Sequence, residues 1–190
     1  MARRIDDLDV RDYDTRTAVR VRLRERREQL GVTQRALGEA LGFEAANVRR
    51  LERAGVDQSY TVTVMRWAAA LGLRLVLEPV GFPPPVGLGR VDTLNDMMAA
   101  LTDAGFAGDE EWEVARIIAD LAGIRAACRV ACAQLAAKIG VTPTAVGLIE
   151  TAGASSALVV LQRHARGIAR CARRPDAYLA VRLEEATALM

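Results

Sequence analysis

Aromatic residues, lysine and long hydrophobic runs are scarce in this chain of 190 residues. Phe, Trp and Tyr make up only 4% of a sequence that is 51% hydrophobic, so a core must consist mainly of Ala, Leu, Val and Ile. That composition favours helices over sheets. The length suits one large domain or two small domains with separate cores.

No run of apolar residues reaches the roughly 18 that a membrane-spanning helix requires. The opening residues, MARRIDDLDVRDYDT, lack the apolar segment of a signal peptide. We therefore expect a cytoplasmic protein that has no contact with a membrane.

Cysteine and histidine are also rare, with three Cys and one His. An odd number of thiols argues against a disulfide framework. Cys128 and Cys132 can share one helical face, as can His164 and Cys171, and zinc accepts such ligands. We favour the alternative that Cys128 is a small core residue, and predict no metal. Since nucleophile motifs and glycine-rich phosphate loops are missing too, the sequence predicts neither an enzyme nor a cofactor.

The net charge of +2 is unevenly distributed along the chain. Residues 20–76 contain eleven Arg and six acidic residues, whereas residues 91–190 contain ten basic and twelve acidic residues. If DNA is a partner, we expect the first half to contact it.

A proline- and glycine-rich segment, EPVGFPPPVGLGR, divides the sequence. Three consecutive prolines disfavour a helix, so the segment is typical of a semi-rigid linker. We predict an N-terminal domain over residues 1–78, a linker over 79–90 and a C-terminal helical domain over 91–190.

The first predicted helix places Val19, Leu23 and Leu30 on one face and ends near Gly31. A second helix follows, with Thr33 as its N-cap.

This second helix stops at Gly42, and a third runs from about Glu44 to Arg53 with Val48 and Leu51 inward. Arg49, Arg50 and Arg53 then point away from the core. A merely solvated basic face is the simplest interpretation of these arginines.

The whole pattern, TQxxLxxxxG, a tight turn and a basic helix ending in LER, closely resembles the helix-turn-helix domain of the XRE/Cro family of phage and bacterial repressors over residues 19–76. The resemblance implies a sequence-specific DNA-binding transcriptional regulator whose third helix lies in the major groove. It implies DNA contacts by Thr33, Gln34, Arg35, Glu44, Ala45, Ala46, Asn47, Arg49, Arg50 and Arg53.

At the family's base-reading positions stand Ala45, Ala46 and Arg50. Arginine can bond to guanine O6 and N7, whereas alanine offers only a methyl group to thymine. The family often has Gln or Ser at the two alanine positions. The resemblance also implies that Arg27 and Glu52 form an internal ion pair, which we assign to structure.

After this domain, a helix through Val64, Trp67 and Leu71 leads into the alternating strand LRLVLEP. That ending resembles the HipB-type antitoxins, in which the strand pairs across a dimer. A lone strand needs a partner, so we expect a homodimer. The rival interpretation pairs it within the chain, with AYLAVRL near the C-terminus.

The second half repeats the first. LGEALGFEAANVRRLE and LAAKIGVTPTAVGLIE align without a gap at an offset of 98 residues, which also places Arg125 on Arg27 and Glu150 on Glu52. The second copy has nonetheless lost the basic face. Gln34, Ala45, Arg50 and Arg53 are replaced by Cys132, Pro143, Leu148 and Thr151.

An exposed leucine favours contact with protein over contact with a base edge. The alternative is that Thr142, Thr144 and Thr151 contact the DNA backbone. Two further amphipathic helices, TLNDMMAALTDAG and DEEWEVARIIADLAG, precede the second copy. Their predicted core residues are Met97, Met98, Leu101, Trp112, Ile117 and Leu121.

The sequence thus predicts an all-α protein of two XRE/lambda-repressor-like domains with a short strand after the first. The expected function is transcriptional regulation, most simply repression, by a homodimer on double-stranded DNA, with a possible protein partner at the C-terminal domain. The alternative is an antitoxin-like or antiactivator protein that sequesters a protein partner and autoregulates through DNA binding.

Overall fold

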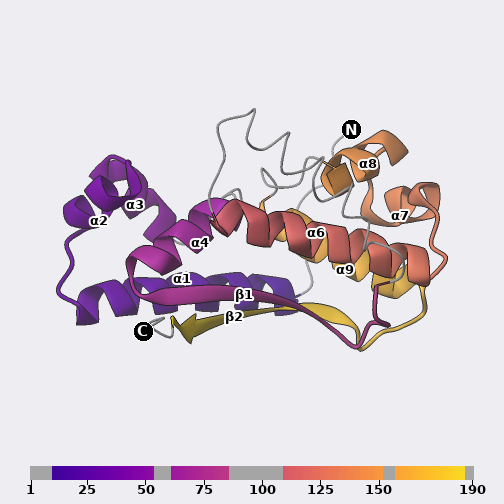
Figure 1. Cartoon of the computed structure of the whole chain (residues 1–190), viewed down its shortest axis with the longest axis horizontal. Coiled ribbons are helices and arrows are strands. Elements are labelled where there is room, and N and C mark those ends of the chain that lie inside the picture. The colour runs from indigo at the N-terminus through magenta and orange to yellow at the C-terminus, as the bar shows by residue number, and fades with distance from the viewer. Residues whose placement is uncertain (1–9, 54–60, 86–108, 152–156, 187–190) are drawn as a thin grey trace. The chain divides into compact units, whose positions relative to one another are not determined.

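The computed structural model describes residues 10–53, 61–85, 109–151 and 157–186. These residues are mostly helical and include one two-stranded sheet (Figure 1). The first elements are α1 (Val10–Gln29), α2 (Gln34–Leu41), α3 (Ala45–Glu52), α4 (Thr61–Ala70) and β1 (Leu73–Val80). They are followed by α6 (Asp109–Ala127), α7 (Cys132–Ile139), α8 (Pro143–Thr151), α9 (Leu158–Cys171) and β2 (Tyr178–Glu185).

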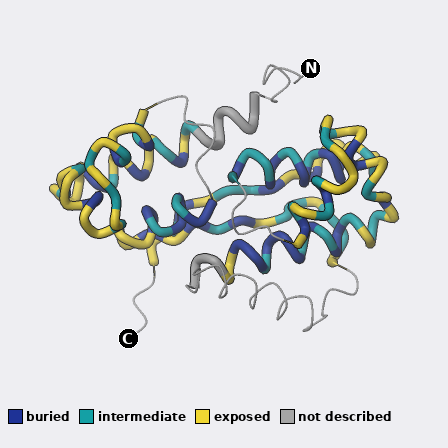
Figure 2. Tube along the Cα trace, turned by 90° about the horizontal axis from the view of Figure 1, so that it is seen from above, coloured by how far each residue is buried: buried dark blue, intermediate teal, exposed yellow. Residues whose placement is uncertain are grey.

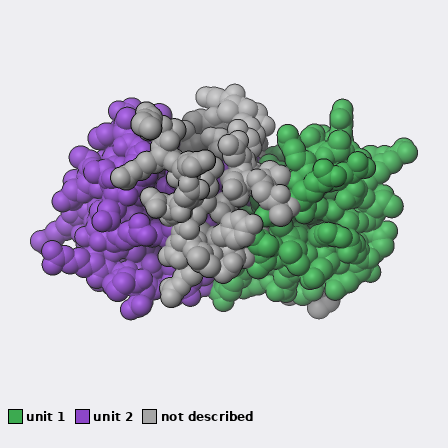
Figure 3. Space-filling model, turned by 180° about the vertical axis from the view of Figure 1, so that it is seen from behind, with its two compact units in different colours: residues 1–59, 63–76, 181–190 green, residues 60–62, 77–180 purple. Residues whose placement is uncertain are grey.

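The chain forms two compact units, which Figure 3 colours separately. Unit 1 contains residues 1–59, 63–76 and 181–190, and unit 2 contains residues 60–62 and 77–180. The units therefore differ from the two consecutive domains that the sequence suggested, because the end of the chain joins unit 1.

The predicted linker over 79–90 is also partly structured. Pro79 and Val80 belong to β1, and Phe82 packs against the core of unit 2. Residues 86–90 lie outside the described residues.

The partner of β1 is β2, so the strand that we expected to lack a partner within its own chain is paired there. The backbone N–H of Ala186 donates to the carbonyl of Gly72 at 3.0 Å, and Arg74 lies 3.5 Å from Glu184. Since the start of one strand meets the end of the other, the pairing is antiparallel. The rival interpretation, pairing with AYLAVRL, is confirmed.

The buried hydrophobic residues of unit 1 are aliphatic residues and one tryptophan. Figure 2 colours the buried residues of the chain dark blue. Val19, Leu23, Leu37, Val48, Leu51, Trp67 and Leu71 are buried. Leu30, in contrast, is 49% exposed, so its predicted place on the buried face of α1 is wrong. Because α1 ends at Gln29, Leu30 falls in the following turn, where helical periodicity no longer applies.

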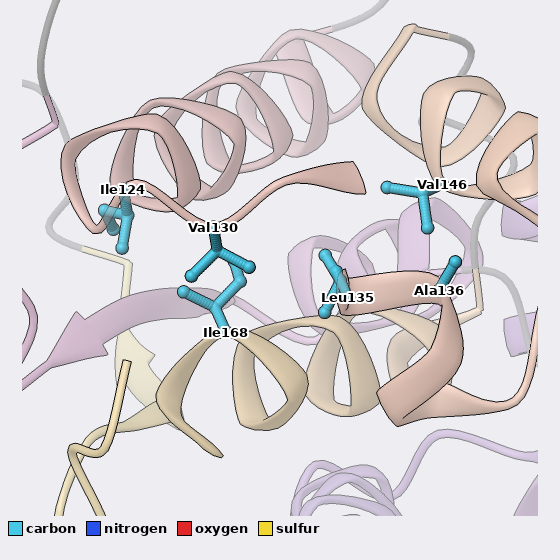
Figure 4. Close-up of a cluster of buried hydrophobic side chains, with 6 residues drawn as sticks. All are labelled: Ile124, Val130, Leu135, Ala136, Val146 and Ile168. Carbon is cyan, nitrogen blue, oxygen red and sulfur yellow. The ribbon is translucent and has the colours of Figure 1, made fainter. Parts of the chain in front are cut away.

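The core of unit 2 is a cluster of aliphatic side chains (Figure 4). Its buried members are Ile124, Val130, Leu135, Ala136, Val146 and Ile168. Ile117 and Leu121 are buried as predicted, but Trp112, in the first turn of α6, is 40% exposed. Trp112 precedes the first buried residue of its helix, so it lies at the rim of the core. Met97, Met98 and Leu101 lie outside the described residues.

The internal repeat is confirmed by the helix boundaries. α2 begins at Gln34 and α7 at Cys132, 98 residues later, and α3 and α8 begin at Ala45 and Pro143 with the same offset. Both copies turn out of their second helix through a glycine with positive φ, Gly42 at 68° and Gly140 at 74°.

A bend of 103° separates the axes of α7 and α8. Among the described helices none has both the length and the apolar composition to cross a bilayer alone.

Candidate nucleic-acid interface

The helix pair α2–α3 is held in place by capping and by a tight turn. Thr33 Oγ1 accepts a hydrogen bond from Ala36 N at 3.1 Å, which confirms the predicted N-cap of α2. At the turn, Phe43 N donates to Gly38 O at 2.7 Å. A Cβ on Gly38 would lie only 2.7 Å from the carbonyl oxygen of Phe43, so this close approach requires glycine.

The outer face of α3 is basic. Val48 and Leu51 are buried while Arg49, Arg50 and Arg53 are exposed, as predicted. Within the described part of the chain, none of these three guanidinium groups takes part in an ion pair. Three other arginines of unit 1, of which Arg26 is half-buried, do have acidic partners: Arg24 lies 2.9 Å from Glu28, Arg26 3.0 Å from Glu185 and Arg35 2.9 Å from Glu39.

The remaining predicted contact residues occupy the start of α3. Glu44 and Ala46 are exposed, whereas Ala45 and Asn47 are half-buried. Glu44 occupies the N-cap position, but its side chain makes no capping hydrogen bond. The start of α3 therefore offers mainly small side chains and backbone to a ligand.

A buried ion pair ties α1 to the end of α3. The Arg27 guanidinium contacts both carboxylate oxygens of Glu52, with 3.1 Å between Nη2 and Oε2, and its Nη1 donates to Val32 O at 2.8 Å. The side chains of Arg27 and Glu52 are 9% and 5% exposed. This pair was expected from the sequence and is confirmed.

Two further contacts were not anticipated. Gln34 Nε2 donates to Glu52 Oε2 at 2.7 Å, so a phosphate contact by that side chain would compete with an internal hydrogen bond. Arg20 Nη1 donates to Arg53 O at 2.9 Å and holds the carbonyl at the end of α3. Attachment to both α1 and α2 thus fixes the orientation of α3.

The second copy contains a matching ion pair. Arg125 Nε and Nη2 each lie 2.7 Å from a carboxylate oxygen of Glu150, and Nη1 donates to Val130 O at 2.9 Å. His164, which is 1% exposed, adds a contact of 3.0 Å between its Nε2 and Glu150 Oε1.

These contacts shift the pKa values of the pair. Burial raises the pKa of the Glu150 carboxyl, but hydrogen bonds from His164 and Arg125 outweigh that effect and leave it below its usual value. The hydrogen bond with Glu150 raises the pKa of Arg125.

The sequence did not reveal that His164 contacts Glu150. This contact matters for the zinc site that the spacing of His164 and Cys171 allowed. The Nε2 of His164 faces Glu150, while Cys171 Sγ lies 3.8 Å from Gln134 O, and Cys128 and Cys132 pack half-buried against the core. No group of three or more His, Cys, Asp or Glu side chains suited to a metal occurs among the described residues. A signal was present in the sequence, because the only histidine aligns with the buried Trp67.

The face of α7 and α8 that corresponds to the basic face of α3 is almost uncharged. Leu148, at the position of Arg50, is 60% exposed. Pro143, Thr142, Thr144 and Thr151 are also exposed. Lys138 and the buried Glu150 are the charged residues of these two helices.

No family model, no curated protein and no solved structure matches the chain.

Proposed function

We propose that the chain is a cytoplasmic, sequence-specific DNA-binding transcriptional regulator that reads the major groove with α3. The observation that carries this proposal is the exposed face of Arg49, Arg50 and Arg53, which have no ion pair among the described residues, whereas the exposed Arg24 and Arg35 of the same unit each have one. Arginines left without acidic partners on a short helix suit a polyanion. The resemblance of this segment to XRE/Cro repressors gives the proposal its specific form.

The residues divide into two roles. Arg50 is the base-reading residue, because a guanidinium can donate two parallel hydrogen bonds to guanine O6 and N7. Arg49 and Arg53 contact phosphates on either side of the groove, and the exposed methyl group of Ala46 fits a thymine. Occupation of a promoter by such a head would repress transcription.

We expect the full chain to enrich one motif when duplexes are selected from a random library. Substitution of Arg50 by alanine (Arg50→Ala) should cost about 1–3 kcal/mol of binding free energy on the selected duplex and relax the preference at one base pair. Loss of a phosphate contact would instead weaken binding to all sequences alike. Competition titrations against duplexes altered one base pair at a time measure both effects.

Arg24→Ala is the matched control, because Arg24 lies on α1, outside the predicted contact residues, and is already paired with Glu28. Its specificity profile should stay that of the wild type. Failure of the wild-type chain to enrich any motif would refute the proposed function.

A second candidate function is the sequestration of a protein partner, as an antitoxin or antiactivator does. It is favoured by the nearly uncharged α7–α8 face, on which Leu148 is 60% exposed. Replacing Leu148 with Glu should then abolish partner capture and leave DNA binding unchanged.

A further inference from the structure

Four exposed arginines of unit 2 lie at or just after the C-terminal ends of α6 and α9. Arg129 directly precedes Val130, and Arg173 directly follows Ala172. Val130 is a member of the buried core cluster and Ala172 packs against the same cluster. Gln134 accepts a hydrogen bond from Ala131 N and contacts Cys171 Sγ, so the two segments that bear these arginines meet at the same residue of α7. Together with their exposed neighbours they form a set that we call the arginine cluster: Arg129, Arg170, Arg173 and Arg174.

The side of α9 that bears this cluster is fixed against α7. Cys171 Sγ lies 3.8 Å from Gln134 O in the first turn of α7, and Arg174 N donates to Ala169 O at 2.8 Å. The cluster therefore has a defined position beside the N-terminal end of α7.

Acidic partners are missing from the cluster. Within the described residues none of its four guanidinium groups forms an ion pair, and the one side-chain bond is a 3.3 Å contact from Arg174 Nη1 to Gly81 O. Arg116, elsewhere in the same unit, is in contrast paired with Glu113 and Asp120.

Two members of the cluster have a conformation that arginine disfavours. Arg129 and Arg173 both have a φ of 55°, and they are the only non-glycine residues with positive φ among those described. The position that matches Arg129 in the first copy is Gly31, with a φ of 66°. A glycine would remove the strain at both sites, so the retained arginines indicate a use for the side chains.

We propose that the arginine cluster binds the phosphate backbone of duplex DNA, as a second contact that reads no bases. This inference rests on the proposed function, since α3 supplies the sequence-specific contact. Arginine suits phosphate because its planar guanidinium can donate two parallel hydrogen bonds. An acidic polypeptide is the competing ligand.

The test compares the full chain with the double variant Arg129→Gly, Arg173→Gly. Glycine relieves the strained φ at both positions, so the Tm should rise or stay unchanged while DNA binding weakens. Each lost phosphate contact makes the negative slope of log K against log salt shallower by about 0.9, so we expect a slope shallower by roughly 2 and an affinity lower by about tenfold or more at 0.1 M salt. The loss should be equal for the selected duplex and for an unrelated one.

Arg116→Ala serves as the control, because this paired arginine of the same unit should leave the slope unchanged. An unchanged slope in the double variant would overturn the inference and leave an acidic polypeptide as the ligand. The proposed function is tested separately by Arg50→Ala, which must alter base preference and not only the affinity common to all duplexes.

Discussion

At the residue scale, the two copies satisfy one buried carboxylate in different ways. Glu52 and Glu150 both accept hydrogen bonds from an arginine 25 residues earlier. The third donor is Gln34 of α2 in the first copy and His164 of α9 in the second. Because His164 supplies the third hydrogen bond to Glu150, the second copy needs no side-chain amide at position 132, which corresponds to Gln34. Cys132 occupies that position and packs against the core.

Glu150→Gln should destabilise the protein by about 3 kcal/mol, because it leaves the charge of Arg125 without a counter-charge in a largely buried site. Chemical denaturation followed by circular dichroism measures the loss. Glu184→Gln, which alters an exposed pair with Arg74, is the matched control and should cost less than about 1 kcal/mol. Equal effects of the two substitutions would mean that the buried pair contributes no more than a surface pair.

The same carboxylate makes stability depend on pH. Since the folded-state pKa of Glu150 lies below its value in the unfolded chain, its contribution is fully present above about pH 4.5 and is lost as the pH falls through the folded-state value. The wild type should therefore lose more stability between about pH 5 and pH 3 than Glu150→Gln. Parallel acid titration curves for the two proteins would contradict this assignment.

The resemblance to XRE/Cro repressors led us to expect the Arg27–Glu52 pair, and the recurrence of its residues at the same spacing led us to expect the Arg125–Glu150 pair. The roles of Gln34 and His164 could not be predicted in this way. The third contact to the buried carboxylate comes from α2 in the first copy and from α9 in the second, so the two residues do not align. A local pattern does not reveal this difference until side chains are placed in space.

At the scale of elements, α9 approaches α7 closely through a glycine. A Cβ on Gly167 would lie 2.4 Å from Ile139 Cγ2 and 2.5 Å from Leu135 Cδ1. Both side chains belong to α7, and Leu135 is fully buried in the core cluster. The close contact between α7 and α9 thus depends on the absence of a side chain at Gly167.

Gly167→Ala should consequently destabilise the protein by about 1–3 kcal/mol, because the added methyl group overpacks the helix contact. Gly147→Ala is the control, since no atom lies within 4 Å of the Cβ that it would add to α8. That substitution should stabilise the protein by about 0.5–1 kcal/mol through helix propensity. Thermal melts that shift in the same direction for both variants would refute this account.

Helix boundaries were predictable because caps are local: Thr33 and Gly42 bound α2 through their own backbone and side-chain chemistry. The partner of β1 could not be derived with the same certainty. Alternation predicts a strand over LRLVLEP, which the structure shows as Leu73–Val80. Its unpaired edge could be satisfied by a second chain, as we expected, or by the segment near the C-terminus, as the structure shows. Pairing over more than 90 residues depends on tertiary contacts, and these carry no local signal.

At the scale of the whole molecule, the proposed function assigns base reading to one basic face in each chain. The second copy has Leu148 in place of Arg50, and β1 is already paired with β2, so under that proposal a second head would come from another chain joined through another surface. We predict that a palindromic duplex binds two chains and that a single half-site binds one. Light scattering of the two complexes gives the stoichiometry directly, since one chain has a mass of 20.5 kDa.

A single chain that protects both half-sites in a footprint would contradict this prediction. In that case α8 would contact DNA as well, through Thr142, Thr144 and Thr151. Replacing these three residues with alanine would then shorten the footprint to one half-site.

The pairing of β1 with β2 has a consequence for synthesis on the ribosome. About 105 residues separate the end of β1 at Val80 from the end of β2 at Glu185. At roughly 5–20 residues per second, the nascent chain would carry β1 without its partner for about 5–20 s. During that interval the edge of β1, rich in leucine and valine, can pair with other nascent chains. The yield of folded protein should therefore depend on translation speed and on chaperones that cover this strand until β2 has been made.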